Sequence, residues 1–164
     1  MRNILVIRGS RDGGKSTTAA YIYNELVTLC VEEHRFKNWP RNEKFITTNT
    51  SNLQYNSHNE LIDFVAIFEI NGKIVVIISR GDVPDDLEQD IKDLLTKHKV
   101  NFDILICCAR LRNVPNSTRR KIQDIFKENI EDFTTAKSNT NDKKTVKIKT
   151  ISEIIRRVKE ITKL

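Results

Sequence analysis

The chain has 164 residues, of which 38% are hydrophobic and 30% are charged, and its formal net charge is +6. This length predicts a single domain over residues 1–164, and the composition excludes an intrinsically disordered chain. No apolar run reaches the roughly 20 residues that a membrane-spanning helix needs, so we expect a cytoplasmic protein with no membrane partner. The positive charge favours anionic partners in general.

Residues 3–8 form a short, continuous apolar run, which is typical of a strand buried on both faces. A glycine-rich turn follows over residues 9–14. From there to Val31, apolar residues recur at spacings of three and four, and this period predicts a helix with one face on the core. The chain is therefore expected to begin as strand, loop and helix.

Residues 32–62 are polar and predict a long connection, in which residues 45–47 are a candidate short strand. Two apolar runs follow, at residues 64–70 and 73–79, and only Asn71 and Gly72 separate them. Asn-Gly fits a type I′ turn because both of its central residues need a positive φ. The pattern predicts an antiparallel hairpin.

Asp82, two residues before Pro84, is typical of a helix start with the aspartate as N-cap. Residues 102–108 predict another buried strand. Beyond a basic stretch, apolar spacing predicts a helix that starts at about Ser117 and includes Ile130.

Residues 134–144 are polar and predict a loop, while residues 145–150 alternate as a half-exposed strand would. Thr150 and Glu153 have the spacing of a capping box, so we expect the last helix to begin there. Strands that alternate with helices predict an α/β three-layer sandwich, with a mostly parallel sheet that contains one antiparallel hairpin strand.

Residues 9–16 read Gly-Ser-Arg-Asp-Gly-Gly-Lys-Ser and match the pattern G-x-x-x-x-G-K-[ST] between a predicted strand and a predicted helix. Glycines let backbone N–H groups curve around a phosphate, and the helix N-terminus directs its positive end at the same anion. In this pattern the lysine reaches the β- and γ-phosphates and the serine hydroxyl coordinates Mg²⁺. The predicted phosphate-binding residues are Gly9, Asp12, Gly13, Gly14, Lys15, Ser16 and Thr17.

Through this segment the chain resembles the P-loop nucleoside triphosphate hydrolase superfamily, and the specific match covers residues 3–31. The resemblance implies the P-loop fold, bound Mg²⁺ held by Ser16, and an acidic residue after an apolar strand that also holds the metal. Asp82 is the candidate for that acid, and capping the next helix is its alternative role. Asp63 and Asp103 precede strands, and in a parallel sheet they are expected at the edge away from a ligand.

The hairpin is similar to that of small GTPases, but the guanine-reading Asn-Lys-x-Asp is missing after residues 102–108, so ATP is favoured over GTP. Small nucleotide and metabolite kinases are also similar, since they carry arginines on a lid at the corresponding place. Those arginines stabilise charge on the transferred phosphoryl group. The resemblance implies such a role for residues of one set: Arg110, Arg112, Arg119 and Arg120.

Three activities stay open. The first is an ATPase or phosphotransferase that acts on the γ-phosphate of Mg-ATP, with Lys15, Asp82, Arg110 and Arg112 as catalytic candidates. The second is a small kinase with an arginine lid, whose phosphorylated small-molecule acceptor would bind near residues 35–59. The third is a nucleotide-dependent switch or a nucleic-acid-associated ATPase, although the sequence contains no nucleic-acid-binding motif to support it.

Overall fold

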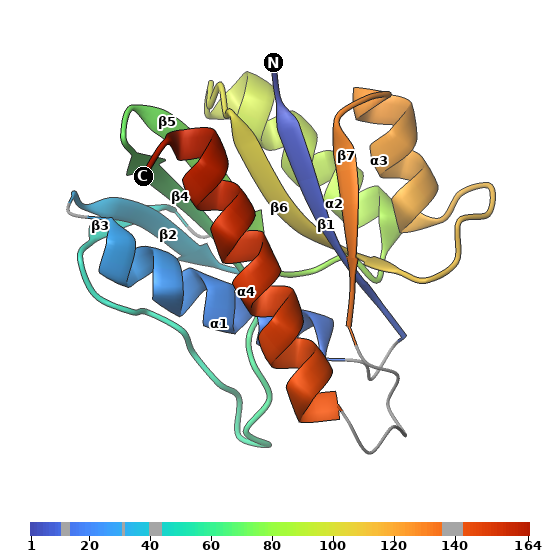
Figure 1. The fold of residues 1–164 in the computed structure, drawn as a ribbon, viewed down its shortest axis with the longest axis horizontal. Coiled ribbons are helices and arrows are strands. Elements are labelled where there is room, and N and C mark those ends of the chain that lie inside the picture. The colour runs from blue at the N-terminus through green and yellow to red at the C-terminus, as the bar shows by residue number, and fades with distance from the viewer. Residues whose placement is uncertain (11–13, 31, 40–43, 136–142) are drawn as a thin grey trace.

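The structure of the protein is a computed structural model, and it describes residues 1–10, 14–30, 32–39, 44–135 and 143–164. Seven strands form one sheet in the order β3-β2-β4-β5-β6-β1-β7 (Figure 1). The parallel part consists of β5 (Lys73–Ile78), β6 (Ile104–Arg110), β1 (Asn3–Gly9) and β7 (Ile130–Thr134). The antiparallel part consists of β4 (Phe64–Ile70), β2 (His34–Asn38) and β3 (Ile46–Thr48). The architecture is therefore α/β with a mixed sheet.

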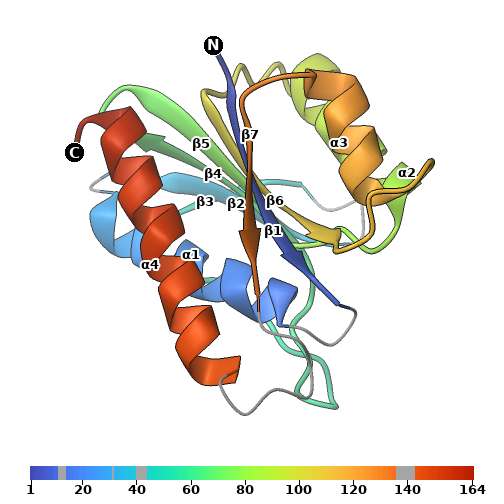
Figure 2. The ribbon, with the colours of Figure 1, turned by 45° about the vertical axis from the view of Figure 1, so that its right-hand side comes forward.

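Helices cover both faces of the sheet and give the three layers that the sequence predicts (Figure 2). Helices α1 (Lys15–Leu29) and α4 (Lys143–Thr162) lie on one face, where Leu26 and Val158 join its core. Helix α2 (Pro84–Lys92), the π-helical turn η1 (Asp93–Lys97) and helix α3 (Thr118–Phe126) lie on the other face. The continuous apolar strands β1 and β6 are buried on both faces because each face has its own layer of helices.

The predicted hairpin is confirmed, since β4 and β5 pair antiparallel and Asn71 and Gly72 adopt φ values of 50° and 75°. The sheet is nevertheless mixed rather than mostly parallel, because β2 and β3 add two antiparallel pairings inside the region predicted as a connection. Strand β2 has few apolar residues, but Phe36 and His34 pack on Tyr23 of α1. Tertiary contacts with α1 thus stabilise a strand that its own sequence hardly predicts.

The C-terminal elements differ more from expectation. The helix predicted to include Ile130 ends at Phe126, and Ile130 instead begins β7, which pairs with β1. Residues 145–150 are not a strand, because α4 already begins at Lys143. Thr150 does not cap this helix; its hydroxyl donates to the carbonyl of Thr134 at 3.0 Å and ties the helix to the end of β7.

Within the part of the chain that the structure describes, no helix combines the length and the apolar character needed to cross a membrane.

Candidate functional site

One edge of the sheet gathers the segments that the sequence singles out. Because β5, β6, β1 and β7 are parallel, their carboxyl ends lie together at this edge. Strand β4 runs the opposite way and so begins there, whereas β2, antiparallel to β4, ends there. We call it the Gly9 edge, after the last residue of β1. Ligands of α/β sheets bind at this kind of edge.

Helix α1 begins at the Gly9 edge. Gly14 precedes it with φ 82°, a left-handed conformation that glycine adopts without strain. Among the described residues no side chain caps this N-terminus and no acid stands in its first turn, so its amide groups are suited to an anion. Ser16 is half-buried and Thr17 is exposed in that turn. Two of the seven predicted phosphate-binding residues, Asp12 and Gly13, lie outside the described residues.

Lys15 is buried, with only 5% of its surface exposed, although it carries a charge. Its Nζ donates hydrogen bonds to the carbonyl oxygens of Gly9 at 3.2 Å and Ser10 at 2.8 Å. It also lies 3.4 Å from Oδ1 of Asp82. A buried ammonium needs such partners because desolvation without them is costly.

Asp82 reaches Lys15 because the chain leaves the sheet directly after β5. Ser79 N still donates to the carbonyl of Phe64 at 3.0 Å, but its hydroxyl accepts the return hydrogen bond from Phe64 N at 2.8 Å, so the pairing with β4 ends at Ser79. Gly81 then crosses the end of β6 so closely that a Cβ atom would lie 1.7 Å from the carbonyl oxygen of Cys108. Asp82 is not the N-cap of α2, because Val83 holds that position and no side chain caps the helix. Its carboxylate therefore contacts groups at the Gly9 edge instead of capping the helix.

Arg110, the last residue of β6, also contacts Asp82, with Nε 3.3 Å from Oδ1. The structure therefore brings Lys15, Asp82 and Arg110 together. Arg112 is exposed in the following loop. Arg119 is buried and donates to both carboxylate oxygens of Asp132, at 2.8 and 3.1 Å, so of the four arginines it is the one engaged inside the fold.

Gly9 itself is closely covered by a residue that the sequence does not single out. A Cβ atom on Gly9 would lie 2.2 Å from Oγ1 of Thr135, the residue after β7. In the same segment, the buried hydroxyls of Ser10 and Thr18 have no hydrogen-bond partner among the described residues. Buried polar atoms usually find a partner, so these two hydroxyls are suited to a hydrogen bond with a ligand or an ordered water.

Asp63 lies at the Gly9 edge, and its expected place at the opposite edge is wrong. It precedes β4, which runs antiparallel to β5, so its carboxylate accepts a hydrogen bond from Ser79 Oγ at 3.1 Å at the end of β5. The correct edge could have been predicted from the hairpin, because a strand that pairs antiparallel begins at the edge where its partner ends.

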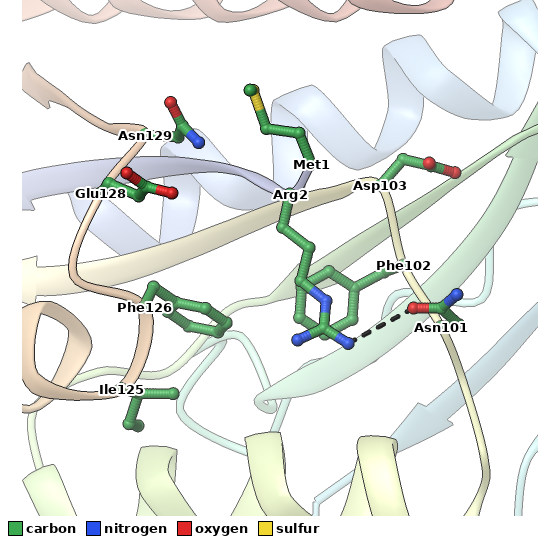
Figure 3. Close-up of a pocket in the computed structure, with 9 residues that line it drawn as sticks. All are labelled: Met1, Arg2, Asn101, Phe102, Asp103, Ile125, Phe126, Glu128 and Asn129. Atoms are coloured by element: carbon green, nitrogen blue, oxygen red, sulfur yellow. Dashed lines mark hydrogen bonds between the residues drawn. The ribbon is translucent and has the colours of Figure 1, made fainter.

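Asp103 does lie at the opposite edge, where β6 begins and a pocket of about 490 Å³ opens (Figure 3). Arg2 stands over the ring of Phe102 in this pocket and donates to Asn101 Oδ1 at 3.3 Å. Asp103 accepts a hydrogen bond from the backbone N–H of Ile74 at 2.8 Å. This pocket contains none of the predicted site residues.

The residues present at the Gly9 edge fit a magnesium ion bound with phosphates. No cluster of three or more His, Cys, Asp or Glu side chains suited to a metal occurs within the described ranges. Mg²⁺ does not need one, because it commonly takes one or two carboxylates, substrate phosphates and several waters. The hydroxyl of Ser16 and the half-exposed carboxylate of Asp82 are oxygen donors of the required kind.

Comparisons of the chain with models of protein families, with curated proteins and with solved structures find no match.

Proposed function

We propose that this chain is a P-loop protein that binds ATP with Mg²⁺ at the Gly9 edge and acts on the γ-phosphate. The observation that carries the proposal is the setting of Lys15. The lysine of the G-x-x-x-x-G-K-S segment is the buried first residue of α1, with its ammonium on the carbonyls of Gly9 and Ser10 and beside Asp82. A strand, a glycine-rich loop and a helix in this order are the context that the motif requires.

Each side chain then has a distinct task. Lys15 exchanges the carbonyl oxygens of Gly9 and Ser10 for phosphate oxygens, which are stronger acceptors for an ammonium. The amide groups at the start of α1 hold the same phosphates. Arg110 faces Asp82 from β6 and is placed to neutralise charge that develops on the γ-phosphate.

Ser16 and Asp82 would hold Mg²⁺, which neutralises phosphate charge and orients the phosphates when it is bound. Asp82 cannot serve Lys15 and the metal equally well, since its Oδ1 already lies 3.4 Å from Lys15 and 3.3 Å from Arg110. Phosphate oxygens that engage the two cations would leave this carboxylate available to hold the metal.

A small kinase is the second candidate, and one observation favours it over a plain ATPase. Strand β2 ends at the Gly9 edge and brings Asn38 and Trp39, which belong to the region expected to bind the acceptor, to the same edge as Lys15. An acceptor held there would approach the γ-phosphate along the sheet edge.

The test compares ATP binding by the parent protein and by Lys15→Met, which keeps the apolar stem of the side chain. We expect the variant to lose about ten- to a hundredfold in ATP affinity, because hydrogen bonds to charged groups contribute about 1.5–3 kcal/mol. Lys73→Met is the matched control: Lys73 also pairs with an aspartate, Asp103, but at the opposite edge of the sheet. Equal affinity of parent and Lys15→Met would refute the proposal.

ATP consumption with Mg²⁺ then separates the alternatives. Turnover that requires a nucleoside monophosphate identifies a kinase, whereas turnover with water alone identifies an ATPase. Stimulation by DNA or RNA that falls steeply with salt supports the nucleic-acid-associated alternative. Binding of GTP measured beside ATP tests the expected preference for ATP.

A further inference from the structure

Asp63 is a second acidic side chain at the Gly9 edge, and the tasks assigned to Lys15, Asp82 and Arg110 leave it unused. The structure holds it firmly. Its carboxylate accepts from the hydroxyl of Ser79, which is fully buried, and its backbone carbonyl accepts from Trp39 N at 2.7 Å. A carboxylate fixed in this way keeps one orientation.

Among the described residues, no cationic side chain forms an ion pair with Asp63. Arg80, two residues after β5, is a cation whose charge acts on Asp63, but it is paired with Asp90 of α2 at 2.8 Å and lies over the ring of Trp39. Burial raises the pKa of Asp63 above its usual range; the hydrogen bond from Ser79 and the charge of Arg80 oppose this, while Asp82 and Asp90 add to it. An acid of this kind binds a proton more readily than an exposed aspartate does.

Asp63 also belongs to the same neighbourhood as the lysine. Cys108 of β6, whose thiol faces the backbone carbonyl of Lys15 at 3.8 Å, is fully buried, and burial raises the pKa of this thiol. The charges of Lys15, Asp63 and Asp82 all act on this one thiol. Asp63 contacts Ser79 at the end of β5, the strand next to β6, and Asp82 contacts Lys15 at the start of α1.

Asn38 adds an unused hydrogen-bond acceptor beside Asp63. It stands opposite Phe64 in the pairing of β2 with β4, so it neighbours the residue that follows Asp63. Only 7% of Asn38 is exposed, and its Oδ1 has no hydrogen-bond partner among the described residues. A buried acceptor without a partner suits a ligand that brings an O–H or N–H donor.

We infer that Asp63 is a catalytic carboxylate of this site: it takes the proton from the hydroxyl that attacks the γ-phosphate, while Asn38 helps to hold that nucleophile. The inference rests on the proposed function. The nucleophile is an O–H donor, either water or the hydroxyl of a small acceptor such as a nucleoside, and the experiment distinguishes the two.

The step balances without a further reactant. The oxygen of the nucleophile forms a bond to the γ-phosphorus with its own electron pair, and its proton passes to the carboxylate of Asp63. The bond between the γ-phosphorus and the β–γ bridging oxygen breaks, and ADP leaves with that electron pair. Asp63 afterwards returns its proton to solvent.

The experiment measures ATP affinity and kcat with Mg²⁺, with water alone and with a panel of nucleosides, for the parent and for Asp63→Asn. Asparagine keeps the size of the side chain and an oxygen for the Ser79 hydroxyl, but it takes no proton. We expect kcat to fall by about 10²- to 10⁴-fold, the usual contribution of a general base, and ATP affinity to change by less than about threefold. The rise of kcat with pH that reports an essential base should disappear in the variant.

Asp103→Asn is the matched control, because Asp103 also precedes a strand and accepts a hydrogen bond but lies at the opposite edge. Formate added to Asp63→Ala should restore part of the activity, which it would not do if Asp63 only supported Ser79. An unchanged kcat in Asp63→Asn, an equal loss in Asp103→Asn, or failure of formate to restore activity overturns the inference. So does a parent protein that binds ATP but consumes none with water or any nucleoside, while the loss of binding in Lys15→Met still supports the nucleotide site.

Discussion

The close contact between Gly9 and Thr135 gives a prediction whose size follows from the structure. In Gly9→Ala the new Cβ would lie 2.2 Å from Thr135 Oγ1 and 3.1 Å from Lys15 Cγ. The easiest relief is rotation of the Thr135 side chain, which breaks its 3.1 Å hydrogen bond to the carbonyl of Arg8. Since Thr135 is 2% exposed, the hydroxyl then stays buried without a partner, and we expect a loss of about 1–3 kcal/mol in unfolding free energy.

Thr135→Ala should remove the conflict at a smaller cost. It deletes one hydrogen bond, but the carbonyl of Arg8 keeps the bond from Thr135 N at 2.7 Å, so the loss should be about 0.5–1.5 kcal/mol. In this background the alanine at position 9 meets the Cβ of residue 135 at 3.5 Å, an ordinary contact, and keeps the 3.1 Å contact with Lys15 Cγ that is present in both backgrounds. Gly9→Ala should then cost less by the part that the Thr135 hydroxyl causes, which gives a coupling energy of about 1–3 kcal/mol between the two positions.

Urea unfolding of the four proteins of this double-mutant cycle measures the coupling. Far-UV circular dichroism and the fluorescence of the lone Trp39 provide two probes, whose agreement tests for a two-state transition. In thermal unfolding, Gly9→Ala should lower the midpoint temperature by about 2–12 °C, since 1 kcal/mol moves the midpoint by about 2–4 °C at this chain length. Equal losses from Gly9→Ala in both backgrounds would refute the reasoning.

Two further predictions concern charged side chains. Arg110→Ala should lower turnover more than ATP affinity. Arg112→Ala, from the exposed loop beside it, should change neither turnover nor ATP affinity. Equal losses of turnover and of ATP affinity in Arg110→Ala would mean that Arg110 only binds the nucleotide. At the contact between α2 and α3, hydrogen bonds from Lys92 and Lys121 lower the pKa of Glu88 to about 2 from the usual 4.5. A pKa that is lowered by folding stabilises the folded state at pH values above the pKa of the unfolded state, so this stabilisation is lost as the pH falls from 4.5 to 2. The unfolding free energy of Glu88→Gln should therefore depend less on pH in this range than that of the parent.

Features that depend on a few neighbouring residues could be predicted from the sequence. The turn at Asn71 and Gly72 needs two positive φ values, and Asn-Gly is the pair that supplies them most readily. Strands β1 and β6 are buried on both faces, so each is a continuous apolar run that no exposed element would contain. The loop between β1 and α1 has its own pattern of residues.

Features that depend on contacts between residues distant in the sequence could not be predicted from it. Strand β2 is held by the ring of Tyr23 from α1, and β7 by its pairing with β1, so neither is apparent in its own residues. Alternation over residues 145–150 is too short to separate a strand from a helix, and α4 is decided by Ile154 and Val158 further along, which pack on the sheet. Asp63 shows a different kind of error, because its edge follows from the direction of β4 and not from its neighbours.

If the proposed function holds, the charges at the Gly9 edge let the same residues serve a state without nucleotide and a state with it. Without a ligand, Lys15 and Arg110 share one carboxylate, Asp82, so the group keeps a net positive charge beside the positive end of α1. In the proposed complex with ATP, phosphate oxygens would satisfy both cations and free Asp82, and a freed carboxylate beside phosphates would suit a divalent cation. Nucleotide and Mg²⁺ should therefore each raise the affinity of the other by the same factor, because coupling between two binding sites is reciprocal.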